Sequence, residues 1–390
     1  MTTSSMRTRR GGRAFGAVAR ILPIVLLVPT AMLFGLYWQS VGQDASFATS
    51  ERHGVEYLQA LVPVEIALTN AESTAVAGGV PPRDSLDRSM DTMSKVDDRL
   101  GDGLRSHDRW VELKTKINAL PTSSGAPSDM FNTYSEVTDL VLALFDKVRN
   151  ESKLIRDPDG DAYYLEDGAA QELPESIVAA AAYAGQTVIA ARPDATQKVD
   201  LANQITADKA DLASNASDLS DDVKLAVEGT GSKTLGTNLL TELDTYNRAI
   251  DALIPNDSAT TARDTAEVNR GRDSVQLAAT ALSTSILTQV DLLIQARLST
   301  LDSKRTVALV TMVVAVLLAL VSLVTGLLGR RRPEGTPPAG AQQSPASRTN
   351  AKSRYPVGEP EPWPAAETTA GRGSAHAAAN TNWERFGASR

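Results

Sequence analysis

The sequence of 390 residues contains no cysteine and only three histidines, His53, His107 and His376. Without cysteine, the chain can form no disulfide, no thiolate nucleophile and no thiolate metal site. Three histidines so far apart also argue against a histidine-rich zinc site. Aromatic residues make up only 5% of the chain, whereas alanine is abundant, and no long stretch alternates strictly between apolar and polar residues. We therefore predict an all-α protein with no metal and no cofactor.

Charge is missing from two long segments, residues 21–38 and 306–329. A helix of 24 residues is about 36 Å long, which is enough to cross a bilayer. The arginines next to the segments are Arg7, Arg9, Arg10, Arg13 and Arg20 before the first, and Arg330, Arg331 and Arg332 after the second. We therefore predict two transmembrane helices. Because basic flanks stay in the cytoplasm, residues 39–305 should lie on the outer side of the membrane. A cleaved signal peptide is the alternative for residues 21–38, but no A-x-A site follows closely.

The distribution of charge agrees with this division into a cytoplasmic N-terminus (1–20), an outside domain (39–305) and a cytoplasmic tail (330–390). The first 20 residues carry +5 and the tail carries +4, and subtracting both from the total of −8 leaves −17 for residues 21–329. We expect such an acidic domain to bind no nucleic acid. The tail holds eight of the nineteen prolines. We expect it to be disordered, to contain no catalytic domain and to dock a cytoplasmic protein.

Between the two apolar segments, apolar residues recur at helical spacing. One such stripe is Leu173, Ile177, Ala181, Ala184 and Val188, and another is Leu282, Ile286, Val290, Leu293 and Leu301. Turn-forming stretches at 78–85, 121–128, 156–161, 192–196, 228–232 and 254–261 separate the helical segments. The stripe at 282–301 enters the second apolar segment without a proline or a turn signal. We therefore predict an elongated helical bundle whose outer helices continue into the membrane.

The stretch RDPDGDAYYLED, residues 156–167, admits three interpretations. Its alternating aspartates begin like a calcium-binding EF-hand loop. Counted from Asp157, that loop needs glycine at its sixth position and glutamate at its twelfth, where this chain has Ala162 and Gly168. Looser calcium binding by three carboxylates remains open. A catalytic carboxylate pair would need a nucleophile or base nearby, and the sequence offers none. A helix start accounts for each residue, with Asp157 as the N-cap and Pro158 in the first helical position.

Three stretches carry a resemblance to a known family. LIRDPDGDAYYLED with ELPE (154–175), ERHGVEYL (51–58) and LLIQARLSTL (292–301) resemble, in order and spacing, the extracellular sensor regions of bacterial methyl-accepting chemotaxis receptors and sensor kinases. The resemblance covers about residues 15–330. In those receptors the second span leads into a HAMP helix pair and an output module, whereas RRRPEGTPPAGAQQ follows here. The candidate ligand-binding residues within these stretches are Arg52, Tyr57, Tyr163 and Tyr164.

The main hypothesis is a two-span protein of the cell membrane with both termini in the cytoplasm. Its sensor-like domain would bind a small ligand or an envelope partner and relay a shift to a separate cytoplasmic protein. A homodimer is one expected state. The alternative is a structural membrane protein whose bundle acts as a spacer or scaffold and whose tail is a docking arm. We expect no enzymatic activity.

The topology is testable with reporter fusions at residues 10, 200 and 350. The arginine flanks predict a cytoplasmic signal at residues 10 and 350 and an outside signal at residue 200. An outside signal from the fusion at residue 350 would contradict the prediction.

Overall fold

Helices make up all the regular structure in the described part of the chain. The computed structural model describes residues 12–154, 160–192, 198–229, 233–254 and 264–328. These ranges contain no strand, which confirms the all-helical fold class. The predicted cap residues Asp157 and Pro158, together with the tail 330–390, lie outside the described residues.

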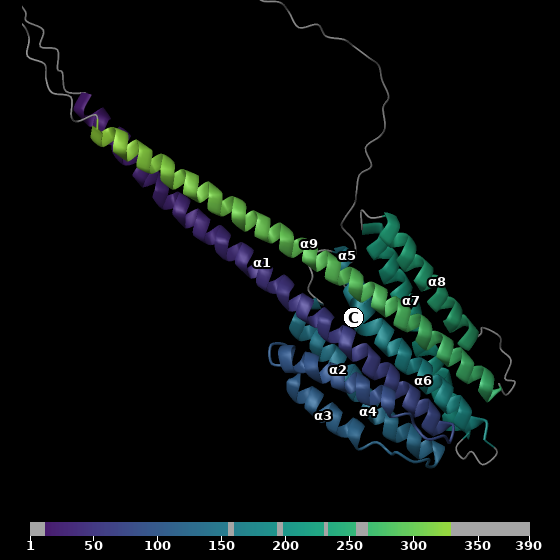
Figure 1. Ribbon diagram of the computed structural model, residues 1–390. Coiled ribbons are helices and arrows are strands. Elements are labelled where there is room, and N and C mark those ends of the chain that lie inside the picture. The colour runs from purple at the N-terminus through teal and green to yellow at the C-terminus, as the bar shows by residue number, and fades with distance from the viewer. Residues whose placement is uncertain (1–11, 155–159, 193–197, 230–232, 255–263, 329–390) are drawn as a thin grey trace, which may run out of the picture. The chain divides into compact units, whose positions relative to one another are not determined.

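Two long helices, α1 (Gly12–Val76) and α9 (Thr265–Leu328), pack against each other. Figure 1 shows them side by side. The side-chain pairs that join them are Trp38 with Arg305, Arg52 with Asp291, and Asn70 with Arg272. Residue numbers rise along α1 as they fall along α9, so the two helices are antiparallel. Helix α9 is a single helix, as expected from the lack of a proline or a turn signal between the stripe at 282–301 and the second apolar segment.

Both helices are long and apolar enough, by length and composition, to cross a membrane. The apolar stretches within Val25–Val76 and Thr265–Thr325 have mean hydropathies of 1.4 and 3.0. They are only 6% and 0% buried, so the protein itself does not cover them. Exposed apolar side chains run from Val25 to Trp38 and from Val307 to Val324, within the predicted spans at 21–38 and 306–329.

The shorter helices surround the rest of this pair. They are α2 (Asp84–Leu100), α3 (His107–Asn118), α4 (Pro127–Ser152), α5 (Gly160–Asp167), a π-helical turn (Gly168–Glu172), α6 (Leu173–Ala190), α7 (Lys198–Gly229) and α8 (Lys233–Leu253). Helices α2 and α4 pack on α1, and α3 packs on α4. Helices α5 and α8 pack on α7 and α9, while α6 contacts α1, α7 and α9. Helix α6 therefore links the two groups of helices (Figure 1).

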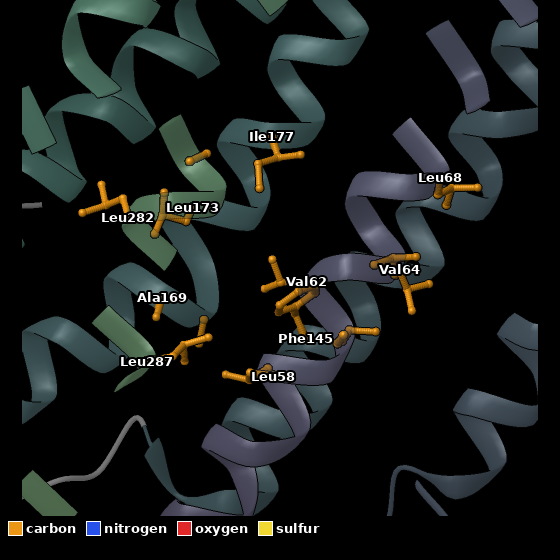
Figure 2. Packing of buried hydrophobic residues seen from close by; sticks show 14 of the residues in the cluster. Leu58, Val62, Val64, Leu68, Phe145, Ala169, Leu173, Ile177, Leu282 and Leu287 are labelled. Carbon is orange, nitrogen blue, oxygen red and sulfur yellow. The ribbon is translucent and has the colours of Figure 1, made fainter. Parts of the chain in front are cut away.

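The main core lies where α1, α4, α6 and α9 meet. Figure 2 shows Leu58 and Val62 of α1 near Phe145 of α4, and Leu173 of α6 near Leu282 of α9. The predicted stripe residues of α6, from Leu173 to Val188, are all buried. Those of α9 are buried too, except that Leu293 is partly buried against the same core. The helical spacing in the sequence thus identified the inward faces of both helices.

One turn was not expected from the sequence. Helix α2 ends at Leu100 and α3 begins at His107, so the chain reverses over residues 101–106. Arg105 adopts a left-handed backbone conformation there, with φ of 50°. The turn contains no proline to mark it. Its two glycines, Gly101 and Gly103, lie in a short polar stretch that looks like the exposed face of a helix.

Gly54 marks the closest approach between α1 and α4. A Cβ atom at this position would lie 2.4 Å from both the Cβ and the Oγ atoms of Ser152. Gly35, farther back on the same helix, has no atom within 4 Å of such a Cβ. The absence of a side chain is therefore needed at Gly54 and not at Gly35.

We predict that Gly54→Ala destabilises the protein by about 1–3 kcal/mol, because the added methyl group forces α1 and α4 apart. Gly35→Ala is the matched control and should cause no loss, since alanine favours the helix. Thermal unfolding of the full chain in detergent would measure both. Equal melting temperatures for the two variants would contradict the close packing at Gly54.

Candidate functional site

A cavity of about 500 Å³ lies among α4, α6, α7 and the end of α1. Its apolar walls include Phe131 and Leu142 of α4 and Val178, Ala179 and Ala182 of α6. This volume falls within the range of small-molecule sites.

The polar lining of the cavity is acidic. Its described carboxylates are Glu72 of α1, Asp139 of α4, Glu175 of α6, and Asp208 and Asp211 of α7. No lysine or arginine is among the described residues that line it. The arrangement brings together negative charges from four helices that are distant in sequence.

Burial makes it costly in free energy to keep these carboxyl groups ionised. It raises the pKa of the Glu72 carboxyl to about 8, although the positive charge of Arg272 lowers that pKa in part. Burial, followed by the negative charge of Asp211, raises the pKa of Asp208 to about 6. Burial also raises the pKa of Glu175. A bound cation would relieve this cost, because opposite charge favours ionised carboxylates.

Two acceptor atoms in the cavity wall lack a hydrogen-bond partner. These are Oε1 of Gln186, a residue only 6% exposed, and Oδ2 of Asp208. A buried acceptor left without a donor costs about 1–3 kcal/mol. A ligand that carries N–H groups would satisfy both atoms.

Helical spacing explains how the sequence builds this lining. Glu175, Ala179, Ala182 and Gln186 follow one another at intervals of four, three and four residues, so they share one face of α6. Asp208, Asp211 and Asn215 form a similar row on α7. The spacing can be read from the sequence, but the pairing of the two rows is a tertiary contact. Sequence analysis did not identify this cavity.

Arg52 and Tyr57, two of the predicted ligand-binding residues, face different neighbours. The Arg52 Nε atom lies 2.9 Å from Asp291 Oδ1 on α9. The Tyr57 ring is fully buried, and its hydroxyl donates a 2.9 Å hydrogen bond to Asp97 Oδ1 on α2. The Oδ2 atom of Asp97 also lies 2.7 Å from His107 Nδ1, and this hydrogen bond, together with the negative charge of Asp97, raises the pKa of His107. Tyr57 therefore anchors α1 to α2.

Tyr163 and Tyr164, the other two predicted residues, lie on α5. Their rings meet edge to face with centroids 5.4 Å apart. Tyr164 packs against the main core. The negative charge of Asp167, together with burial, raises the pKa of Tyr163. Tyr163 and Tyr164 thus contact each other, whereas Arg52 and Tyr57 pair with Asp291 and Asp97.

A separate group of carboxylates, Asp167, Glu172 and Asp222, has the geometry to share a metal ion. Their oxygen atoms lie within 4.8 Å of one another. The group is not part of the cavity lining.

Comparison of the chain with protein-family models, with curated proteins and with solved structures gave no match.

We predict that Glu72→Gln flattens the pH dependence of stability. Between its ordinary pKa of 4.5 and its folded value of about 8, Glu72 keeps its proton when folded and loses it when unfolded. Stability should therefore fall as pH rises through this window, and the glutamine variant should lose that part of the slope. Melting temperatures at pH 5 and pH 8 would measure the effect.

The control for this experiment is Glu112→Gln, the same chemical change at an exposed position on α3. It should keep the slope of the unmodified protein. Identical slopes for all three proteins would show that Glu72 is not buried with a raised pKa.

Proposed function

We propose that this protein is a membrane-anchored sensor whose helical domain binds an organic cation, of the amine or polyamine class, in the acidic cavity. The observation that carries this proposal is the lining of that cavity, where carboxylates from four helices stand beside apolar walls. The ligand-binding residues that we propose therefore differ from those predicted from the sequence, which were Arg52, Tyr57, Tyr163 and Tyr164.

The chemistry of the lining suits an amine with a hydrocarbon chain. Ammonium groups would pair with Asp208, Asp211 and Glu175, and would donate to the unpartnered oxygen of Gln186. The methylene groups between them would pack on Val178 and Ala182. The face of the Phe131 ring offers a further favourable contact for a cation. An anionic ligand would meet repulsion throughout.

The same helix that lines the cavity also carries an apolar end. Glu72 lies 34 residues beyond Trp38 on α1, a distance of about 50 Å along a helix. Arg272 of α9 lies close enough to influence the charge of Glu72. Ligand binding would alter the charge balance between the two helices. We propose that the resulting shift travels along α1 and α9.

Two contacts nearer the apolar ends support a coupled motion of the two helices. Arg297 Nη1 lies 3.0 Å from Oε2 of Glu51, whose side chain is fully buried. Arg52 and Asp291 form a second, more exposed pair. Because a buried ion pair is costly to break, α1 and α9 should shift as a unit or exchange partners.

The arginine flanks of the two apolar segments support a placement in the cell membrane. We propose that residues 39–305 stand outside the cell membrane and that both termini are cytoplasmic. The output would then pass to a separate cytoplasmic protein through residues 330–390. The scaffold alternative shares this placement and differs in having no ligand in the cavity.

The test is isothermal titration calorimetry of the full chain in a non-ionic detergent, with spermidine as the probe. We expect saturable binding, weakened at least tenfold by Asp208→Asn, because that variant removes a charge without changing the shape of the side chain. Glutamate, as an anionic probe, should give no binding.

The matched control is Asp221→Asn, which removes the same charge from an exposed position on the same helix. It should leave spermidine binding unchanged. Equal weakening by both variants would mean that spermidine is attracted only by the overall negative charge. That result, or the absence of binding, would favour the scaffold alternative.

A further inference from the structure

The π-helical turn between α5 and α6 places two carboxylates on one side of the chain. In this turn the Leu173 N–H donates to the Gly168 carbonyl, five residues earlier. In an α-helix, Glu172 would lie about 1.4 turns after Asp167 and would point away from it. The wider turn brings residues five apart back to the same side, and such turns are frequent at functional sites.

Helix α7 brings the third carboxylate, Asp222, to this turn. The backbone at Gly168 lies so close to α7 that a Cβ there would stand 2.9 Å from Leu219 Cδ1. As a result, oxygen atoms of Asp167, Glu172 and Asp222 all lie within 4.8 Å of one another. Segments at least 50 residues apart in sequence thus contribute to one group.

Glu172 gives an independent indication that the group is built for a ligand. The residue is only 8% exposed, yet its Oε2 atom has no hydrogen-bond partner. A buried carboxylate oxygen that receives no hydrogen bond is an open coordination position for a cation.

Among the described residues, the charges around the group leave it short of positive charge. Arg149, whose side chain is 13% exposed, lies 3.3 Å from Asp167 and 3.2 Å from Asp146. One guanidinium therefore serves two carboxylates and does not offset the charges of Glu172 and Asp222. A divalent cation would balance those two charges.

We infer that Asp167, Glu172 and Asp222 bind a divalent cation of the size of calcium. The donors are oxygen atoms only, which suits calcium or magnesium and not zinc, whose usual ligands are sulfur and nitrogen. Calcium accepts several carboxylate ligands in flexible geometry, whereas magnesium is usually held by one or two carboxylates and keeps several waters, so three carboxylates favour calcium.

None of these three residues lines the cavity, and the inference does not depend on the proposed amine ligand. It also differs from the loose calcium site considered for the three aspartates within 157–161, since it uses Asp167, the last residue of RDPDGDAYYLED, with Glu172 and Asp222. The cation would join the π-helical turn to α7 and so fix the start of α6. It departs from the sequence-based expectation of a protein without metal.

The test is calorimetric titration of calcium chloride into the full chain in a non-ionic detergent, after treatment with a chelator. We expect one calcium ion per chain and binding at least tenfold weaker in Asp222→Asn and in Glu172→Gln. Each variant keeps the shape of the side chain, and the two lie on different helical segments. A rise in melting temperature on adding calcium should also be lost in both.

Asp221→Asn is the matched control, because it removes a charge next to Asp222 from a side chain that is 70% exposed. It should bind calcium like the unmodified protein. Equal loss in all three variants would show attraction to a generally acidic surface and would overturn the assignment. No binding, or tighter binding of magnesium than of calcium, would overturn it as well.

Two crossed measurements separate this inference from the proposed function. Asp208→Asn should weaken spermidine binding and leave calcium binding intact. Asp222→Asn should do the reverse. If each variant weakened both ligands to the same extent, the two sites would not be distinct, and the calcium assignment would fail.

Discussion

The antiparallel packing of α1 against α9 is the contact on which the rest of this structure depends. The two helices supply opposite ends of the chain to one core, and the shorter helices pack on them or on each other. A cation–π contact of Arg305 with Trp38, an ion pair between Arg52 and Asp291, and a hydrogen bond from Arg272 to Asn70 join them along their length. The pair extends from the exposed apolar ends into the core. A single alignment of α1 against α9 therefore sets the positions of both the apolar ends and the core.

A second constraint is the burial of acidic groups in a domain that is already acidic. Glu72 and Glu172 are both nearly inaccessible, and burial raises the pKa of each. Charged groups in such positions reduce stability unless something compensates for them. Glu72 belongs to the cavity lining and Glu172 to the carboxylate group at the π-helical turn, so each lies beside other acidic side chains. Under the two proposals, a cation bound at each place would remove this cost.

Local patterns in the sequence predicted much of the fold, because helix formation and inward faces depend on nearby residues. The stripe that begins at Leu173 and the turn signals before Asp84 and Pro127 were sufficient for this. The stretch ERHGVEYL proved structurally informative: Gly54 permits close packing on α4, and Tyr57 bonds to Asp97. The cavity was beyond prediction, since Glu72 and Asp208 meet only through tertiary packing. The π-helical turn was also missed, because no local signal marks five-residue hydrogen bonding.

The distance of the cavity from the apolar end of α1 has a consequence for what it would sense. With that end placed in a bilayer, Glu72 would stand about 50 Å along the helix from the lipid surface. The electrostatic potential of anionic lipids decays over about 8 Å at physiological ionic strength. Cations accumulate within that thin layer, so a site close to the lipid would respond to the composition of the membrane. A cavity several decay lengths away would respond instead to the concentration of cations in the surrounding solution.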